Sequence, residues 1–190
     1  MGRTRASSRL AAAAVIVIAT LGVGIGQAAT GGSDRSDHKE HSEFAPFNGE
    51  GESTHCPRKK AALERNKRNV VAFYTTAFND KEPERAVARY GGAEYIQHNP
   101  LADNGFEAFI AFVNTFTATF PDLHIEIVRV FAECDFVITH GKLTGAVPVF
   151  GERGSKVVDI FRLDRRGRVV EHWDVLAAIS ATSVNGNPEV

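Results

Sequence analysis

The residues of this sequence that could do acid–base chemistry are histidines and aspartates in three separate segments. His98 and His140 each lie in a segment of their own, while Asp159, His172 and Asp174 lie closer together towards the C-terminal end. A histidine or a carboxylate in an apolar pocket can remove a proton next to a carbonyl group, because burial moves its pKa towards neutrality. A second histidine, a tyrosine or an arginine can stabilise the enolate that forms. These residue types could therefore support proton transfer.

Strand pairing decides which of these side chains can meet, because alternate side chains of a β-strand share a face. If Asp164 pairs with Arg168 across the short turn between them, Asp159 lies opposite Trp173. In that register the two polar residues on either side of Trp173 lie on the other face. A one-residue bulge at Gly167 would change these cross-strand partners. We therefore expect Asp159 and Trp173 to line one cavity.

We predict a site built from three catalytic candidates and five residues that line a substrate pocket. The catalytic candidates are Asp159, His98 from the first extended segment and His140 from a central hairpin. The pocket residues are Tyr95, Phe161, Trp173, His172 and Asp174. No metal site is expected. The histidine pair His38 and His41 could suggest one, but it has no third ligand nearby.

Each candidate also has a purely structural interpretation, which the sequence leaves open. His98 precedes Asn99–Pro100 and could bond the backbone of that turn. Asp159 lies between two apolar residues, where a carboxylate is costly unless Arg162 or a histidine pairs with it. The remaining candidates could make structural hydrogen bonds: His140 within its apolar strand, and His172 and Asp174 with each other or with a dimer partner.

The elements that must position these residues change from helical to extended along the chain. Apolar residues recur at helical spacing in Lys59–Asn79 and Phe106–Phe120. A shorter helix is expected at Pro83–Arg89, because proline suits the first turn of a helix. Extended segments are expected at Glu94–His98 and, after the third helix, at Leu123–Phe131, Phe136–Val147, Lys156–Asp164 and Arg168–Ala177. Helices followed by hairpin-linked strands predict a single α+β domain with helices on one face of a curved sheet. The open end of such a sheet is a place where small-ligand pockets form.

The N-terminal part of the chain is expected to direct export. A segment with three arginines precedes an uncharged apolar run and then small residues, which is typical of a signal peptide over residues 1–28. An uncleaved N-terminal anchor is the alternative, and either one places the domain outside the cytoplasm. Residues 29–57 are rich in small and charged residues and predict a disordered linker. The folded domain is expected at residues 58–180, and a tail at 181–190.

Charge and cysteine content limit the partners and the compartment. A net charge of -1 gives no basic surface for phosphates, so we do not expect nucleic acid as a partner. The two cysteines, Cys56 and Cys134, permit one disulfide in an oxidising compartment. The sequence leaves open whether their Cα atoms lie within the ~7 Å that a disulfide requires.

Three segments resemble the SnoaL-like family of the nuclear-transport-factor-2-like superfamily: Tyr95–Pro100, Val158–Arg162 and Gly167–Val175. The resemblance implies a cone-shaped fold of three helices on a strongly curved antiparallel sheet, often dimeric through that sheet. Polyketide cyclases of this family close a ring by intramolecular aldol condensation without a metal or organic cofactor, so no cofactor is expected. Antibiotic-pathway cyclases place a catalytic Asp on the last strand. The nearest carboxylate here is Asp174, and Ala177, the same-parity position after Val175, cannot act as an acid or base.

Two classes of function stay open. One is a cofactor-free lyase or isomerase acting on a small, mostly apolar carbonyl compound, which the polar cluster favours. The other is a non-catalytic domain that binds a hydrophobic small ligand outside the cytoplasm, which Ala177 and the export signal favour. We favour the enzyme, and a buried set of converging His and Asp side chains would discriminate for it.

Overall fold

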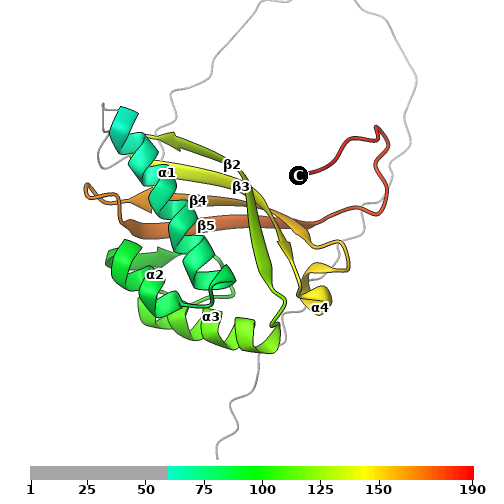
Figure 1. The fold of residues 1–190 in the computed structure, drawn as a ribbon, viewed down its shortest axis with the longest axis horizontal. Coiled ribbons are helices and arrows are strands. Elements are labelled where there is room, and N and C mark those ends of the chain that lie inside the picture. Colours follow the sequence, from blue (N-terminus) through cyan, green and yellow to red (C-terminus); the bar gives the residue numbers. More distant parts are fainter. Residues whose placement is uncertain (1–59) are drawn as a thin grey trace, which may run out of the picture. The chain divides into compact units, whose positions relative to one another are not determined.

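The structure is a computed structural model that describes residues 60–190, and this part begins with helices and ends with strands. The first elements are α1 (Lys60–Tyr74), the π-helical turn η1 (Thr75–Asn79), α2 (Pro83–Tyr90), β1 (Gly91–Gln97) and α3 (Phe106–Thr119). They are followed by β2 (His124–Glu133), β3 (Phe136–Thr144), α4 (Val147–Phe150), β4 (Ser155–Leu163) and β5 (Val169–Ala178). This order confirms the predicted α+β class (Figure 1).

The predicted signal peptide, residues 1–28, and the predicted linker, residues 29–57, lie outside the described residues. Their boundaries stay predictions. Within residues 60–190, no helix is both long enough and apolar enough to cross a membrane.

The five strands form one mixed sheet in the order β1-β5-β4-β3-β2. Strands β2 to β5 are antiparallel neighbours, as expected for consecutive strands. Strand β1 pairs in parallel with β5, so the expectation of a wholly antiparallel sheet is wrong for this strand. The reason is that β1 has no hairpin partner: α3 follows it and carries the chain to β2 at the opposite edge. The pairing brings the end of β1 beside the polar residues of β5.

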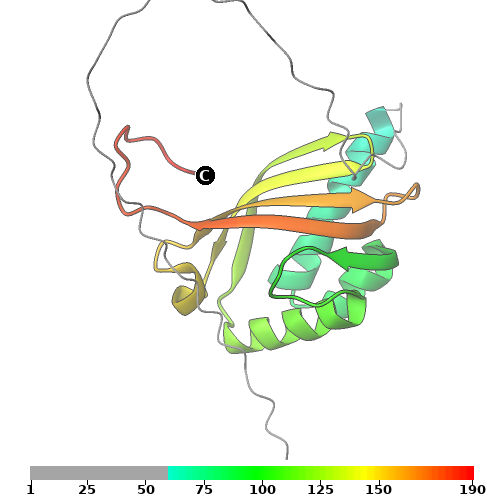
Figure 2. The same cartoon turned by 180° about the vertical axis from the view of Figure 1, so that it is seen from behind.

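The helices α1, α2 and α3 lie on one side of the sheet, which we call the inner face, and the opposite side is the outer face (Figures 1 and 2). Apolar residues at helical spacing turn towards the inner face, and Phe73 of α1 stacks on Phe109 of α3 with ring centroids 5.0 Å apart. Alternate residues of β4, among them Val157 and Phe161, complete this core. The core is rich in aromatic rings and surrounds the polar residues described below.

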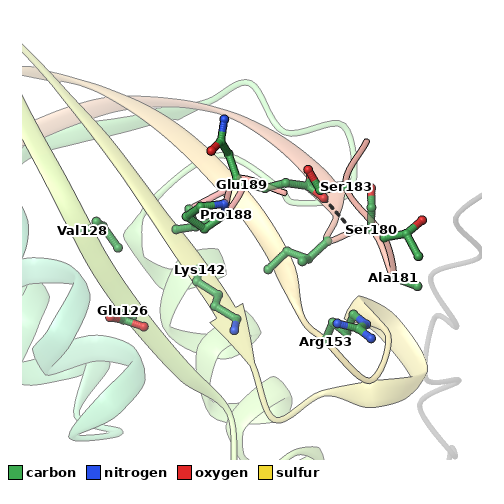
Figure 3. Close-up of a pocket in the computed structure, with 13 residues that line it drawn as sticks. Glu126, Val128, Lys142, Arg153, Ser180, Ala181, Ser183, Pro188 and Glu189 are labelled. Atoms are coloured by element: carbon green, nitrogen blue, oxygen red, sulfur yellow. Dashed lines mark hydrogen bonds between the residues drawn. The ribbon is translucent and has the colours of Figure 1, made fainter. Parts of the chain in front are cut away.

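The segment after β5 folds back over the outer face of the sheet (Figure 3). Glu189 forms an ion pair with Lys156 of β4 and accepts a hydrogen bond of 2.8 Å from the backbone N–H of Ser180. The hydrogen bond from the Lys156 ammonium group lowers the pKa of Glu189 to about 2. A depression of about 440 Å³ lies between this segment and the sheet, and Lys142 and Arg153 contribute to its lining. No histidine lines this depression, so the acid–base candidates gather elsewhere.

Candidate active site

A one-residue bulge in the β4–β5 hairpin decides which polar side chains meet. Next to the turn the register is the expected one, with Leu163 opposite Val169. One step further along, Arg162 lies opposite Glu171, so Val170 is an extra residue of β5. From this point every residue of β5 is shifted by one position relative to β4. The predicted register is therefore wrong beyond the bulge, which lies at Val170.

The shift brings two more polar residues to the inner face beside Asp159. Asp174 now lies opposite Asp159, and His172 lies opposite Phe161. Asp159 and His172 are 4% and 3% exposed, respectively, so both are buried in the core. The His and Asp side chains therefore form a buried, converging set.

Asp159, His172 and Tyr74 of α1 form a triangle of hydrogen-bonding atoms. The Tyr74 hydroxyl group donates to Asp159 Oδ1 at 2.9 Å, and its oxygen also lies 2.9 Å from His172 Nε2. His172 Nε2 lies 3.3 Å from the same oxygen of Asp159. A carboxylate and an imidazole this close in a low-dielectric interior can share a proton.

Two further side chains hold the triangle from outside. Thr139 of β3 donates from Oγ1 to Asp159 Oδ2 at 2.9 Å, so both oxygens of the carboxylate have partners. Gln97, the last residue of β1, places its Oε1 2.9 Å from His172 Nδ1. The site is thus assembled from α1 and four strands that are far apart in the sequence.

Asp174 is half-buried, unlike Asp159, and lies two residues after His172 on the same face. The Asn99 side-chain amide donates to both Asp174 carboxylate oxygens, at 2.8 and 3.1 Å. Asp159, His172 and Asp174 each have one potential metal-ligand atom within 4.8 Å of the other two. Within residues 60–190, no other three His, Cys, Asp or Glu side chains converge in this way. Two carboxylates and an imidazole could bind a divalent cation. In this structure the Asp159 and His172 atoms bond Tyr74.

Two buried phenols, Tyr74 and Tyr95, belong to the same cluster. The Tyr95 ring lies nearly parallel to the His172 imidazole, with centroids 6.3 Å apart, and its hydroxyl accepts a hydrogen bond of 3.4 Å from Gln97 Nε2. Burial raises the pKa of both phenols above the ordinary value, and the negative charge of Asp159 raises it further. Both phenols therefore keep their protons at neutral pH and can donate to an oxygen on which negative charge develops.

The raised pKa values of the two phenols predict a loss of stability at high pH. Above about pH 10 the unfolded chain releases phenol protons that the folded chain still holds, so the free energy of unfolding falls as the pH rises. Each buried phenol should add about 1.4 kcal/mol per pH unit to this slope. We expect Tyr95→Phe to remove about half of the slope in urea unfolding between about pH 10 and 11. An unchanged slope would mean that the Tyr95 phenol titrates normally.

Comparison with known proteins shows the family to which this chain belongs. The family model for the SnoaL-like domain matches residues 70–172, which is more than half of the chain. The protein belongs to the SnoaL-like domain family. The matched range contains Tyr74, Asp159 and His172, so it includes the whole triangle. No curated protein gives a significant match.

Two solved structures are similar to this chain. A protein from Jannaschia sp. CCS1, provisionally named a SnoaL-like polyketide cyclase, is 23% identical with a TM-score of 0.51, over 63% of this chain and 90% of that one. A protein from Acidithiobacillus ferrooxidans, provisionally named a polyketide cyclase, is 19% identical with a TM-score of 0.49, over 59% and 87%. The likeness to the Jannaschia protein supports the fold, and a fold by itself does not select a reaction.

In this SnoaL-like domain His98 and Trp173 lie on the outer face, away from Asp159. The His98 ring stacks on Trp173 with centroids 4.4 Å apart. His98 Nε2 donates to Glu171 at 2.8 Å, and Arg162 forms an ion pair with the same carboxylate. The structure therefore does not bring His98 or Trp173 to Asp159. The bulge turns Trp173 outward and His172 inward. His98 lies outward because it alternates with Gln97, whose side chain reaches His172 on the inner face.

His140 also lies on the outer face of the SnoaL-like domain. It pairs with Val158 across β3 and β4, and its Nδ1 accepts a hydrogen bond of 3.0 Å from Arg129 Nη1. Its neighbour Thr139 is the residue of β3 that reaches Asp159. His140 is thus separated from the polar cluster by the sheet itself.

The other predicted pocket residues of the SnoaL-like domain do lie on the inner face. The Tyr95 and Phe161 rings pack against His172, and the Phe161 and His172 centroids are 4.9 Å apart. Four residues that complete the cluster are not among the predicted site residues: Tyr74, Gln97, Asn99 and Thr139. The hydroxyl of Tyr74 within the apolar stripe of a helix is the one sequence signal that could have pointed to it.

Proposed function

We propose that this SnoaL-like protein is a cofactor-independent lyase or isomerase that moves a proton on a small, mostly apolar carbonyl compound. The observation that supports the proposal is the buried triangle of Tyr74, Asp159 and His172 beside the half-buried Asp174. Ionisable groups are costly to bury. Their convergence in an aromatic interior is typical of sites where protons are transferred.

The geometry suggests a role for each group. Asp174 is the acid with exposure to an entering ligand, so we assign it the removal of the proton next to the carbonyl group. The Tyr95 hydrogen has no acceptor among the described residues, so this phenol can donate to the enolate oxygen as charge develops. The Asp159 and His172 pair lies within 4.8 Å of Asp174 and can hold the proton or deliver it to another carbon. Returning the proton to another carbon completes an isomerisation. In an aldol-type step the enolate carbon instead forms a bond to a second carbonyl carbon of the substrate, and the proton goes to the oxygen of that carbonyl group.

The test is exchange of substrate hydrogen for solvent deuterium, followed by NMR over a panel of small ketones and β-keto esters. We expect Asp174→Asn to slow the exchange by about 10²–10⁴-fold, the usual contribution of a positioned base. Asp103→Asn is a matched control, because Asp103 is exposed in the loop before α3. Equal exchange in both variants would exclude Asp174 as the base.

A binding domain for a hydrophobic small ligand is the second candidate. It is favoured by the partly buried Phe112 and Phe116 of α3, whose rings stack with centroids 5.4 Å apart. The polar atoms of the triangle also form hydrogen bonds with one another, which favours a domain that binds its ligand without catalysis. Tight binding of apolar compounds without any exchange, in the wild type and in Asp174→Asn alike, would support this alternative.

We also propose that the protein is a homodimer that pairs through the outer face of the sheet. Phe131, Ile138, Ile160 and Trp173 are cross-strand neighbours in a row over four strands, and Val175 on this face is 70% exposed. Exposed apolar rows of this kind commonly mark an interface.

The dimer predicts that Val175→Arg weakens self-association by at least about a hundredfold, because it places an unpaired charge in the interface. Sedimentation of the full chain measures the effect. Leu101→Arg, in an exposed loop, should leave association unchanged. A wild type that stays monomeric at all concentrations would contradict the proposal.

Export from the cytoplasm is a further proposal. Cys134 is disulfide-bonded, and disulfides persist mainly in oxidising compartments. Cell fractionation with a C-terminal tag, combined with the mass of the purified chain, tests both export and cleavage near residue 28. A full-length chain in the reducing cytoplasm would contradict it.

A further inference from the structure

We propose that Gln97 is a positioning residue that fixes which nitrogen of His172 carries a permanent proton. Its catalytic meaning rests on the proposed function, but the hydrogen-bonding argument does not. Neither the family match nor the related structures assign a role to this residue. The inference follows from two hydrogen bonds that meet at one atom, Oε1 of Gln97.

The orientation of the Gln97 amide is set by the backbone. The N–H of Asn99 lies 2.9 Å from Gln97 Oε1, and a backbone N–H can only donate. The atom that faces it must therefore be the amide oxygen rather than the nitrogen. The amide nitrogen then points to the Tyr95 hydroxyl, 3.4 Å away.

The fixed oxygen determines the tautomer of His172. His172 Nδ1 lies 2.9 Å from Gln97 Oε1, which has no hydrogen to offer. Nδ1 must therefore carry the proton, because two lone pairs at this distance would repel each other. While the Tyr74 hydroxyl donates to Asp159, Nε2 also faces only acceptors and therefore carries a proton as well. When the ring is neutral, the missing proton is the one on Nε2, and the Tyr74 hydroxyl can turn its single hydrogen from Asp159 to the lone pair of Nε2. The nitrogen that gains and loses a proton is thereby the one inside the triangle.

The segment that carries Gln97 is itself held firmly. The Gln97 backbone N–H donates to Asn104 Oδ1 at 2.8 Å, and the next N–H donates to the His172 carbonyl at 3.0 Å. The Asn99 amide is oriented in the same way. Its Oδ1 accepts a hydrogen bond of 2.9 Å from the Leu101 backbone N–H, so its amide nitrogen points to Asp174. Gln97 at the end of β1 and Asn99 two residues after it thus orient His172 and Asp174 of β5.

The experiment is imidazole ¹⁵N NMR of the full-length chain at a pH at which the ring of His172 is neutral. In the wild type we expect the His172 signals of a protonated Nδ1 and an unprotonated Nε2. Gln97→Leu, which removes the acceptor, should shift the ring to a mixture of tautomers or to the Nε2–H form. Gln97→Glu, which keeps an acceptor at this position, should restore the wild-type pattern.

Asn104→Ala is the matched control, because it removes a hydrogen bond to the Gln97 backbone and leaves its side chain intact. It should not change the tautomer. A wild-type Nδ1–H pattern that persists in Gln97→Leu would overturn the inference. So would a shift of the same size in Asn104→Ala.

Activity measurements separate this inference from the proposed function. If the protein catalyses exchange, Gln97→Leu should lower kcat by about a hundredfold with little change in KM, as expected for a misplaced catalytic group. If Gln97→Leu shifts the tautomer of His172 and the wild type has no activity, the role of Gln97 is supported and the proposed enzyme function is excluded. If the protein is active and Gln97→Leu changes neither the activity nor the tautomer, the enzyme function is supported and the role of Gln97 is contradicted.

Discussion

Asp159→Asn is expected to slow the proposed proton transfer by about 10²–10⁴-fold while leaving the domain folded. Asparagine has the same shape and can still accept the Tyr74 hydrogen bond, so the packing of the triangle survives. It removes the negative charge that stabilises a protonated His172, 3.3 Å away. The loss should therefore appear in the rate of deuterium exchange, with a cooperative thermal unfolding transition retained.

Thr139→Val separates the charge of Asp159 from its orientation. The valine removes the hydrogen bond to Asp159 Oδ2 and leaves the carboxylate in place. We expect it to reduce exchange by about 10- to 100-fold, because a hydrogen bond to a charged group contributes about 1.5–3 kcal/mol. If Asp159→Asn changes the unfolding temperature alone and exchange continues at the wild-type rate, the buried pair is structural.

Breaking the disulfide of Cys134 is expected to lower the free energy of unfolding by about 4 kcal/mol. Cys134 has a positive φ of 52° in the two-residue turn between β2 and β3, a conformation that is unfavourable for residues other than glycine. Cys56, the other cysteine of the sequence, lies outside the described residues. A bond between the two closes a loop of about 80 residues, which restricts the unfolded chain.

Urea unfolding of the full chain with and without a reducing agent measures this effect. Cys134→Ser and Cys56→Ser should each reproduce the loss seen on reduction, and the double variant should lose no more than either one. Full stability in Cys56→Ser would mean that Cys134 does not depend on this partner in solution.

The sequence by itself determined the class of fold and the identity of the buried acid. Helical periodicity and alternation are local, so the order of helices and strands can be read directly. Asp159 stands out for the same reason, as a carboxylate between two apolar residues in a strand. The family could also be recognised, because its motifs occupy short continuous segments.

The tertiary structure decided which polar side chains meet. Residues 169–172 at the start of β5 are all buried, so the alternation of exposed and buried positions that would fix the register is missing there. The extra residue, Val170, then exchanges Trp173 for His172 on the inner face. Tyr74 and Gln97 join the cluster only because α1 crosses the sheet and β1 pairs in parallel with β5. These are long-range contacts, which no local pattern in the sequence records.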